Sequence, residues 1–109
     1  MYSLKVYVLN NCYYCNQTKL LLKNNNIKAK IITVKEDQKY KYKNKDISTF
    51  PMIYILNKKK KILIGGYDKL ALIINQINNK SLTKQINYVK KELPKWKKKD
   101  ILRLLSILN

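Results

Sequence analysis

The sequence predicts an α/β fold, in which a small sheet is sandwiched by helices and a helical segment follows at the C-terminus. Short runs of strand-forming residues alternate with segments of helical periodicity, in the order β-α-β-α-β-β-α. With 109 residues, 46% of them hydrophobic, the chain can form one compact domain with a buried core. No Gly/Ser-rich linker divides it, and most of its turns are marked by Asn because it contains only two Gly.

The first half is expected to contain two strands and two helices. Residues 4–9 carry strand formers on both faces and end at a pair of asparagines, which tolerate left-handed dihedrals. Residues 13–23 have helical periodicity and stop at a run of asparagines. Residues 27–34 become continuously apolar, which is typical of a strand next to the sheet centre. The polar, lysine-rich segment 36–46 predicts an exposed helix.

The third and fourth strands are expected to form a hairpin. Residues 52–56 and 62–64 are short apolar runs, and the lysine-rich segment 57–61 between them would be its charged tip. A helix should follow over residues 69–77, with Asp68 at its N-cap. Together these elements complete a domain that we expect to span residues 1–80.

Residues 81–109 are expected to be a helical extension that packs on this domain. Ser81 can cap a helix that runs to about Glu92, and Pro94 breaks it. The stretch 95–108 then carries Ile and Leu at the spacing of an amphipathic helix, so its apolar face should be buried.

The net charge of +18 has two interpretations. A basic chain attracts polyanions such as nucleic acid. However, all but one of the 24 basic residues are Lys, with Arg103 the exception, whereas base readout and bidentate phosphate contacts favour Arg. Abundant Asn, Ile and Tyr are typical of an AT-rich coding sequence. We therefore expect a general surface charge, and nucleic-acid binding by the lysine-rich C-terminal helix is the alternative.

Several classes of site are excluded by residue type. The chain has no His, which excludes Ser-His-Asp and Cys-His catalysis and His-ligated metal sites. Its two Cys cannot form a four-thiolate zinc site, so we expect no metal ligands within one chain. The longest apolar run, Phe50 to Leu56, is too short to span a membrane, and the N-terminal residues lack the features of a secretion signal. We expect a cytoplasmic monomer that does not bind membranes.

The segment Cys12-Tyr13-Tyr14-Cys15 carries the candidate chemistry. Cys12 lies between a predicted strand and a predicted helix, where unpaired N–H groups and the helix dipole favour an anion. The pKa of its thiol should therefore lie below that of a free thiol. Cys15, inside the first helical turn, can close a disulfide with Cys12 and should be more shielded. This asymmetry favours a redox pair in which one sulfur attacks and the other resolves.

The segment Thr49-Phe50-Pro51 precedes the third predicted strand. Proline lacks an N–H group, so it is tolerated there because it stands at the start of the strand. A cis peptide bond before Pro51 would expose the backbone N–H and carbonyl of Phe50 to a peptide-like ligand.

The segment Gly65-Gly66-Tyr67-Asp68 opens the next helix. Free N–H groups at a helix start can hold a carboxylate, and Asp68 can pair with an ammonium group. Because Asn replaces Gly at most other turns, the glycine pair suggests dihedrals that Asn would not accept or a ligand close to the backbone.

In order and spacing, these three motifs resemble the glutaredoxin family of the thioredoxin superfamily over about residues 3–80. The resemblance implies a thioredoxin-like fold, with a four-stranded mixed sheet in the order 2-1-3-4, flanking helices and a cis Pro51. It implies a glutathione-dependent thiol-disulfide oxidoreductase that acts on protein disulfides and protein–glutathione mixed disulfides, with glutathione as co-substrate. By position, Cys12 would be the nucleophile and Cys15 the resolving thiol. The implied glutathione-binding residues are Tyr14, Thr49, Phe50, Pro51, Tyr67 and Asp68.

Three positions depart from the family pattern. Tyr13 stands where the family usually has Pro, Leu9 where it usually has Lys, and Lys69 where it commonly has an acid. The departures at Leu9 and Lys69 leave open a protein of this fold that is reduced by a thioredoxin reductase in place of glutathione. The departure at Tyr13 leaves open a non-enzymatic scaffold, in which Cys12 of two chains and two glutathiones hold a [2Fe–2S] cluster.

Overall fold

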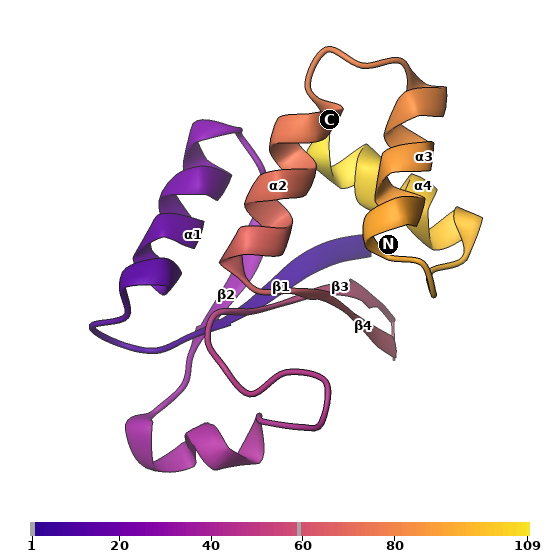
Figure 1. The fold of residues 1–109 in the computed structure, drawn as a ribbon. Coiled ribbons are helices and arrows are strands. Elements are labelled where there is room, and N and C mark those ends of the chain that lie inside the picture. The colour runs from indigo at the N-terminus through magenta and orange to yellow at the C-terminus, as the bar shows by residue number, and fades with distance from the viewer. Residues whose placement is uncertain (1, 59) are drawn as a thin grey trace.

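A four-stranded sheet in the order β2-β1-β3-β4 forms the centre of the molecule (Figure 1). The computed structural model describes residues 2–58 and 60–109. Its strands are β1 (Tyr2–Val8), β2 (Ala29–Thr33), β3 (Met52–Asn57) and β4 (Lys60–Gly65). β1 pairs in parallel with β2 and antiparallel with β3, and β3 pairs antiparallel with β4. The predicted mixed sheet and its strand order are therefore confirmed.

The helices lie mostly on one side of this sheet. They are α1 (Tyr13–Asn24), α2 (Tyr67–Ile77), α3 (Leu82–Glu92) and α4 (Lys98–Leu108), and a short 3-10 helix, η1 (Glu36–Lys41), lies on the opposite side (Figure 1). α3 packs on α2 and α4, and α4 reaches β1. Within the two described ranges, no helix combines the length and the apolar character that crossing a membrane would require.

Both faces of the sheet are apolar because β1 alternates between them, as its sequence predicts. Leu4, Val6 and Val8 are fully buried in the main core, beneath the four α-helices. Tyr7 points to the other face, where it packs in a smaller cluster with Val34, Met52 and Tyr54. A strand that is apolar on both faces needs cover on both sides, which the helices provide on one side and the segment after β2 provides on the other.

The C-terminal helices belong to the main core. Val89 of α3 and Ile101, Leu104 and Leu105 of α4 are at most 1% exposed and lie in the same cluster as the buried residues of β1. The Ser81 side chain accepts a hydrogen bond from the Lys84 N–H, so the predicted N-cap of α3 is confirmed. The division into residues 1–80 and 81–109 stays a prediction, because buried side chains from both parts belong to the main core.

Several local predictions are wrong. Segment 36–46 forms a 3-10 helix over residues 36–41 only, because that element buries no residue and so gains little from packing. β2 does lie next to the central strand β1, but it is an edge strand, and its Ile31 is 41% exposed, so the burial expected from its apolar run is wrong. The N-cap of α2 is Gly66, whereas Asp68 lies in the first helical turn, where the helix dipole favours its negative charge. The predicted charged tip includes Lys59, which lies outside the described residues.

Asparagine takes the place of glycine at several turns. Asn11, Asn26 and Asn79 have positive φ values of 55°, 55° and 60°. Asn tolerates this region because its short polar side chain can bond to nearby backbone. Asn11 lies in the turn between β1 and α1, directly before the segment that carries the cysteines.

Candidate functional site

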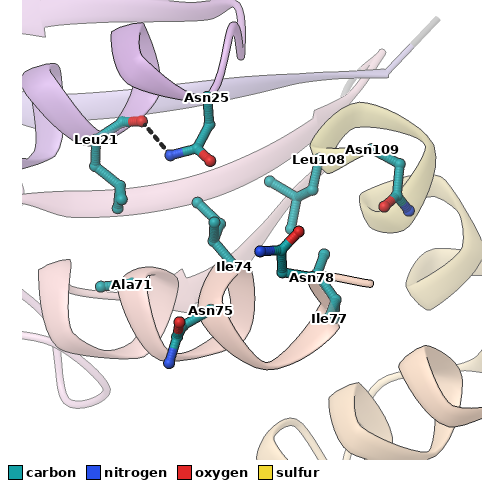
Figure 2. Close-up of a pocket in the computed structure, with 9 residues that line it drawn as sticks. All are labelled: Leu21, Asn25, Ala71, Ile74, Asn75, Ile77, Asn78, Leu108 and Asn109. Carbon is teal, nitrogen blue, oxygen red and sulfur yellow. Dashed lines mark hydrogen bonds between the residues drawn. The ribbon is translucent and has the colours of Figure 1, made fainter. Parts of the chain in front are cut away.

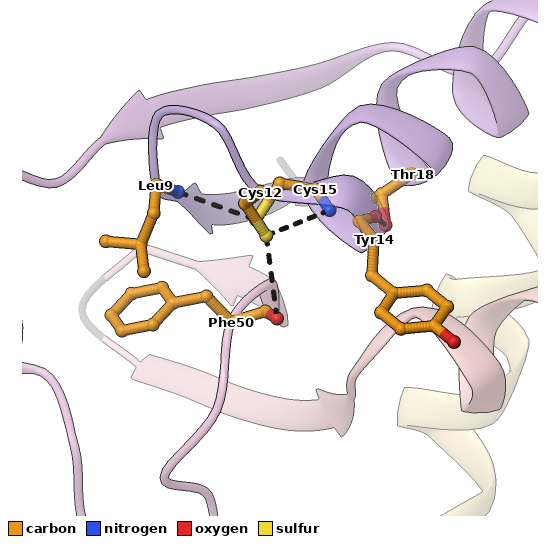
Figure 3. Close-up of a disulfide and its surroundings, with 6 residues drawn as sticks. All are labelled: Leu9, Cys12, Tyr14, Cys15, Thr18 and Phe50. Carbon is orange, nitrogen blue, oxygen red and sulfur yellow. Dashed lines mark hydrogen bonds between the residues drawn. A yellow bond between two sulfur atoms is a disulfide. The ribbon is translucent and has the colours of Figure 1, made fainter.

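Cys12 and Cys15 lie at the junction between β1 and α1, and their sulfur atoms form a disulfide (Figure 3). Cys12 is the N-cap residue of α1, and its Sγ accepts a hydrogen bond from the Cys15 N–H at 3.2 Å. The sulfur therefore occupies the position of a capping oxygen, facing N–H groups that the helix leaves unpaired. The predicted location of Cys12 at a helix N-terminus is confirmed.

The two sulfur atoms differ in accessibility. Cys15 is fully buried, and its Sγ accepts a hydrogen bond from the Leu9 N–H at 3.5 Å. Cys12 is partly exposed. Behind the pair, the buried Thr18 hydroxyl donates to the Tyr14 carbonyl at 2.7 Å, which holds the first turns of α1. Cys12 is therefore the more accessible cysteine of the pair, and Cys15 is the shielded one.

The segment before β3 faces the cysteines from across the site. The Phe50–Pro51 peptide bond is cis, as the resemblance implied. The Phe50 carbonyl oxygen lies 3.9 Å from the Cys12 sulfur, and Figure 3 shows the two atoms facing each other. The backbone of this segment therefore lies beside the accessible sulfur.

A groove of about 490 Å³ extends beside this segment. It brings together the six residues that the resemblance implied for glutathione and adds three more from the end of β4 and the start of α2. Its lining residues are Tyr14, Thr49, Phe50, Pro51, Gly65, Gly66, Tyr67, Asp68 and Lys69. The groove thus lies between α1, the segment before β3 and the N-terminus of α2, and all three motifs contribute to it.

Aromatic rings extend from the cysteine segment to α2. The Tyr14 ring lies 5.7 Å from the Tyr67 ring at an interplanar angle of 32°, and Tyr13 meets Tyr14 edge-on at 5.1 Å. Tyr13 is 67% exposed, and it occupies the position where the family usually has Pro. Tyr14 and Tyr67 both line the groove, so their contact joins its two helical walls.

The N-terminus of α2 faces the groove with unpaired backbone donors. The N-cap is Gly66, and in the described part of the chain no side-chain hydrogen bond caps this end of the helix. Gly65 has a φ of 144°, and a Cβ there would lie 3.0 Å from the Lys69 Cβ, so only glycine fits. At Gly66 an added Cβ would meet nothing nearer than the Pro51 oxygen at 3.6 Å. Unpaired N–H groups of this kind bind anions.

Sequence reasoning missed one contact at the groove. The Lys69 ammonium lies 3.3 Å from both the carbonyl oxygen and the carboxylate Oε1 of Glu92, the last residue of α3. The same carboxylate acts on Tyr88, which also lies on α3. Partial burial of Tyr88, and then the negative charge of Glu92, raise the pKa of its hydroxyl group. Residues 69 and 92 belong to different predicted elements, and no local pattern indicates that α3 packs beside α2.

A second cavity has no charged or nucleophilic side chain among the described residues that line it. This cavity of about 270 Å³ lies between α1, α2 and the end of α4 (Figure 2). Among the described residues, those that line it are apolar or carry amides: Leu21, Asn25, Ala71, Ile74, Asn75, Ile77, Asn78, Leu108 and Asn109. In residues 2–58 and 60–109, His, Cys, Asp and Glu side chains nowhere form a group of three or more that could hold a metal ion.

Known proteins resemble the chain in sequence and in fold. The glutaredoxin family model matches residues 4–60, which include both cysteines and the cis Pro51. The crystal structure of glutaredoxin 1 from Francisella tularensis, complexed with cacodylate, is 29% identical in sequence with a TM-score of 0.58. The match covers 73% of this chain and 100% of that one. No curated protein shows significant similarity to the chain. Since the family model matches more than half of the sequence, the chain belongs to the glutaredoxin family.

Proposed function

We propose that this thiol-disulfide oxidoreductase uses glutathione to reduce protein–glutathione mixed disulfides and protein disulfides. The observation that carries the proposal is the position of the accessible Cys12 sulfur, 3.9 Å from the carbonyl of Phe50, which lines the adjoining groove. A tripeptide whose sulfur is bonded to Cys12 would have its backbone beside Phe50. Its remaining length could then extend toward the unpaired N–H groups of α2.

The first reaction is the reduction of a mixed disulfide. The Cys12 thiolate attacks the glutathionyl sulfur, so that a Cys12–glutathione disulfide forms and the bond to the substrate protein breaks. The substrate leaves as a thiolate and takes up a proton. A second glutathione thiolate then attacks the glutathionyl sulfur on Cys12, which releases oxidised glutathione and restores the Cys12 thiolate. The glutathionyl group taken from the substrate and one free glutathione have become one disulfide in this cycle, and the disulfide of the substrate has become a thiol, so bonds and electrons balance.

The second reaction uses both cysteines. The Cys12 thiolate attacks a protein disulfide and forms a mixed disulfide with the substrate. Cys15 then attacks the Cys12 sulfur, which releases the reduced substrate and leaves the Cys12–Cys15 disulfide. The burial of Cys15 supports this role, because a shielded thiol reacts with its neighbour in preference to external disulfides. Two glutathione molecules reduce the resulting disulfide.

The groove supports a specific pose for glutathione. The backbone N–H and carbonyl of Phe50 would pair with the cysteinyl residue, between Thr49 and Pro51. Tyr14 would form the wall nearest the sulfur. At the far end, Tyr67 and the N–H groups of α2 would receive the γ-glutamyl carboxylate, and Asp68 its ammonium group. Both cysteines and the groove come from a single chain, which supports action as a monomer. Dependence on reduced glutathione favours the cytoplasm.

The test is turnover of a glutathionylated peptide and of a protein disulfide with glutathione as reductant. Cys12→Ser should lower both rates by more than about 100-fold, because the nucleophile is lost. Cys15→Ser should spare the glutathionylated peptide and abolish reduction of the protein disulfide. Full activity of Cys12→Ser would contradict the mechanism. Faster turnover with a thioredoxin reductase than with glutathione would instead support the alternative electron donor.

A further inference from the structure

Lys69 connects the groove to the C-terminal helices. Its stem lies against Gly65 in the wall of the groove, since a Cβ on Gly65 would come within 3.3 Å of both its Cβ and its Cγ. Its ammonium group reaches the end of α3, 3.3 Å from the Glu92 carbonyl and 3.3 Å from the Glu92 carboxylate. One side chain therefore contacts both the proposed ligand site and a helix outside the residues that the family model matches.

Two features hold the ammonium group at α3. The C-terminal carbonyls of a helix carry partial negative charge, which favours a cation there. The Glu92 carboxylate adds a full negative charge, and its side chain is 20% exposed while that of Lys69 is 36% exposed. A pair this exposed is weak, so another carboxylate can compete for the ammonium group.

The charges that line the groove explain why this competition matters. Its described lining contains one acid, Asp68, and one base, Lys69. Glutathione carries two carboxylates and one ammonium group near neutral pH. A cation in the groove therefore increases the affinity for it. Lys69 has a long stem with rotatable donors, and it can turn from Glu92 toward a ligand carboxylate.

We propose that Lys69 is the anion-binding side chain of the groove and that Glu92 competes with the ligand for it, so that α3 sets the affinity for glutathione. This inference rests on the proposed function. It makes Lys69 a specificity-determining residue and Glu92 a positioning residue. The C-terminal helices thus lower the affinity for the ligand through Glu92, in addition to completing the core.

The experiment measures equilibrium binding of S-methylglutathione, a thioether that occupies the groove without forming a disulfide. Lys69→Gln should weaken binding about two- to five-fold, as expected for a partly exposed ion pair. Glu92→Gln should strengthen binding by a similar or smaller factor, because the ammonium group loses its competing charge. Glu36→Gln is the matched control, since it removes the same charge from another Lys–Glu pair, that of Lys39 and Glu36 in η1. Its binding should equal that of the wild type.

Two further measurements separate the outcomes. In the Lys69→Gln background, Glu92→Gln should have no effect, because the residue through which it acts is gone. The dimethyl ester of S-methylglutathione, which lacks both carboxylates, should show no difference between the variants, and thermal unfolding of each variant shows that it is folded. Unchanged binding of S-methylglutathione to Lys69→Gln, or equal gains in Glu92→Gln and Glu36→Gln, would overturn this inference alone. Failure of the wild type to bind would overturn it together with the proposed function.

Discussion

The region around the cysteines and the region formed by α3 and α4 differ in how completely their side chains are buried. Around the cysteines, burial is uneven: Cys15 is fully buried, whereas Cys12 and the backbone of Phe50 remain accessible at the edge of a groove. In α3 and α4 burial is continuous, and Val89, Ile101, Leu104 and Leu105 complete the main core. Chemistry therefore depends on a few exposed atoms at one end of the sheet, and stability depends on side chains far from them along the chain.

The largest effect expected from this difference is on stability. Leu104 in α4 is fully buried, so Leu104→Ala should lower the free energy of unfolding by about 2–5 kcal/mol. Leu102 lies on the same helix and is 39% exposed, and Leu102→Ala should change it by no more than about 0.5 kcal/mol. Chemical denaturation measures both values. The folded Leu104→Ala protein should alkylate Cys12 at the wild-type rate, and a changed rate would show that the two regions are not independent.

A smaller effect is expected at the glycine pair, where backbone geometry and the groove meet. Gly65→Ala should cost about 1–3 kcal/mol of stability, because its φ of 144° disfavours any side chain and the new Cβ would press on Lys69. It should also weaken binding of S-methylglutathione. Gly66→Ala is the matched control, because its φ is −98° and an added Cβ would make only an ordinary contact with the Pro51 oxygen at 3.6 Å. Thermal unfolding of both variants tests the difference, and equal destabilisation would contradict the role given to Gly65.

The sequence predicted those features that local chemistry determines. A cysteine just before a helix becomes its N-cap, Ser81 caps α3, and positive φ falls on asparagines such as Asn11. The strand order and the cis Pro51 followed from the family resemblance, since no local pattern specifies them. The residues implied for glutathione lie in one groove, but their roles stay predictions.

What the sequence did not predict depends on contacts between distant elements. Asp68 has the chemistry of an N-cap, yet α2 begins at Tyr67 because the preceding glycines make the turn. β2 has the apolar run typical of a strand next to the sheet centre, and it pairs only with β1, so one of its edges and part of its surface stay exposed. The Lys69–Glu92 contact needs α3 to pack beside α2, and that packing is decided by the whole core.

Thiol chemistry in this protein depends on the start of α1, which we expect to stabilise the Cys12 sulfur as a thiolate. The most direct test is a pH titration of the thiolate ultraviolet absorbance in the reduced Cys15→Ser variant, in which Cys12 alone titrates. The N–H of residue 15 remains in this variant and still faces the sulfur, 3.2 Å away in the structure. We expect the pKa of the Cys12 thiol to lie well below the value of about 8.5 for a free thiol. A pKa equal to that of free cysteine would contradict the claim and, with it, the proposed nucleophile.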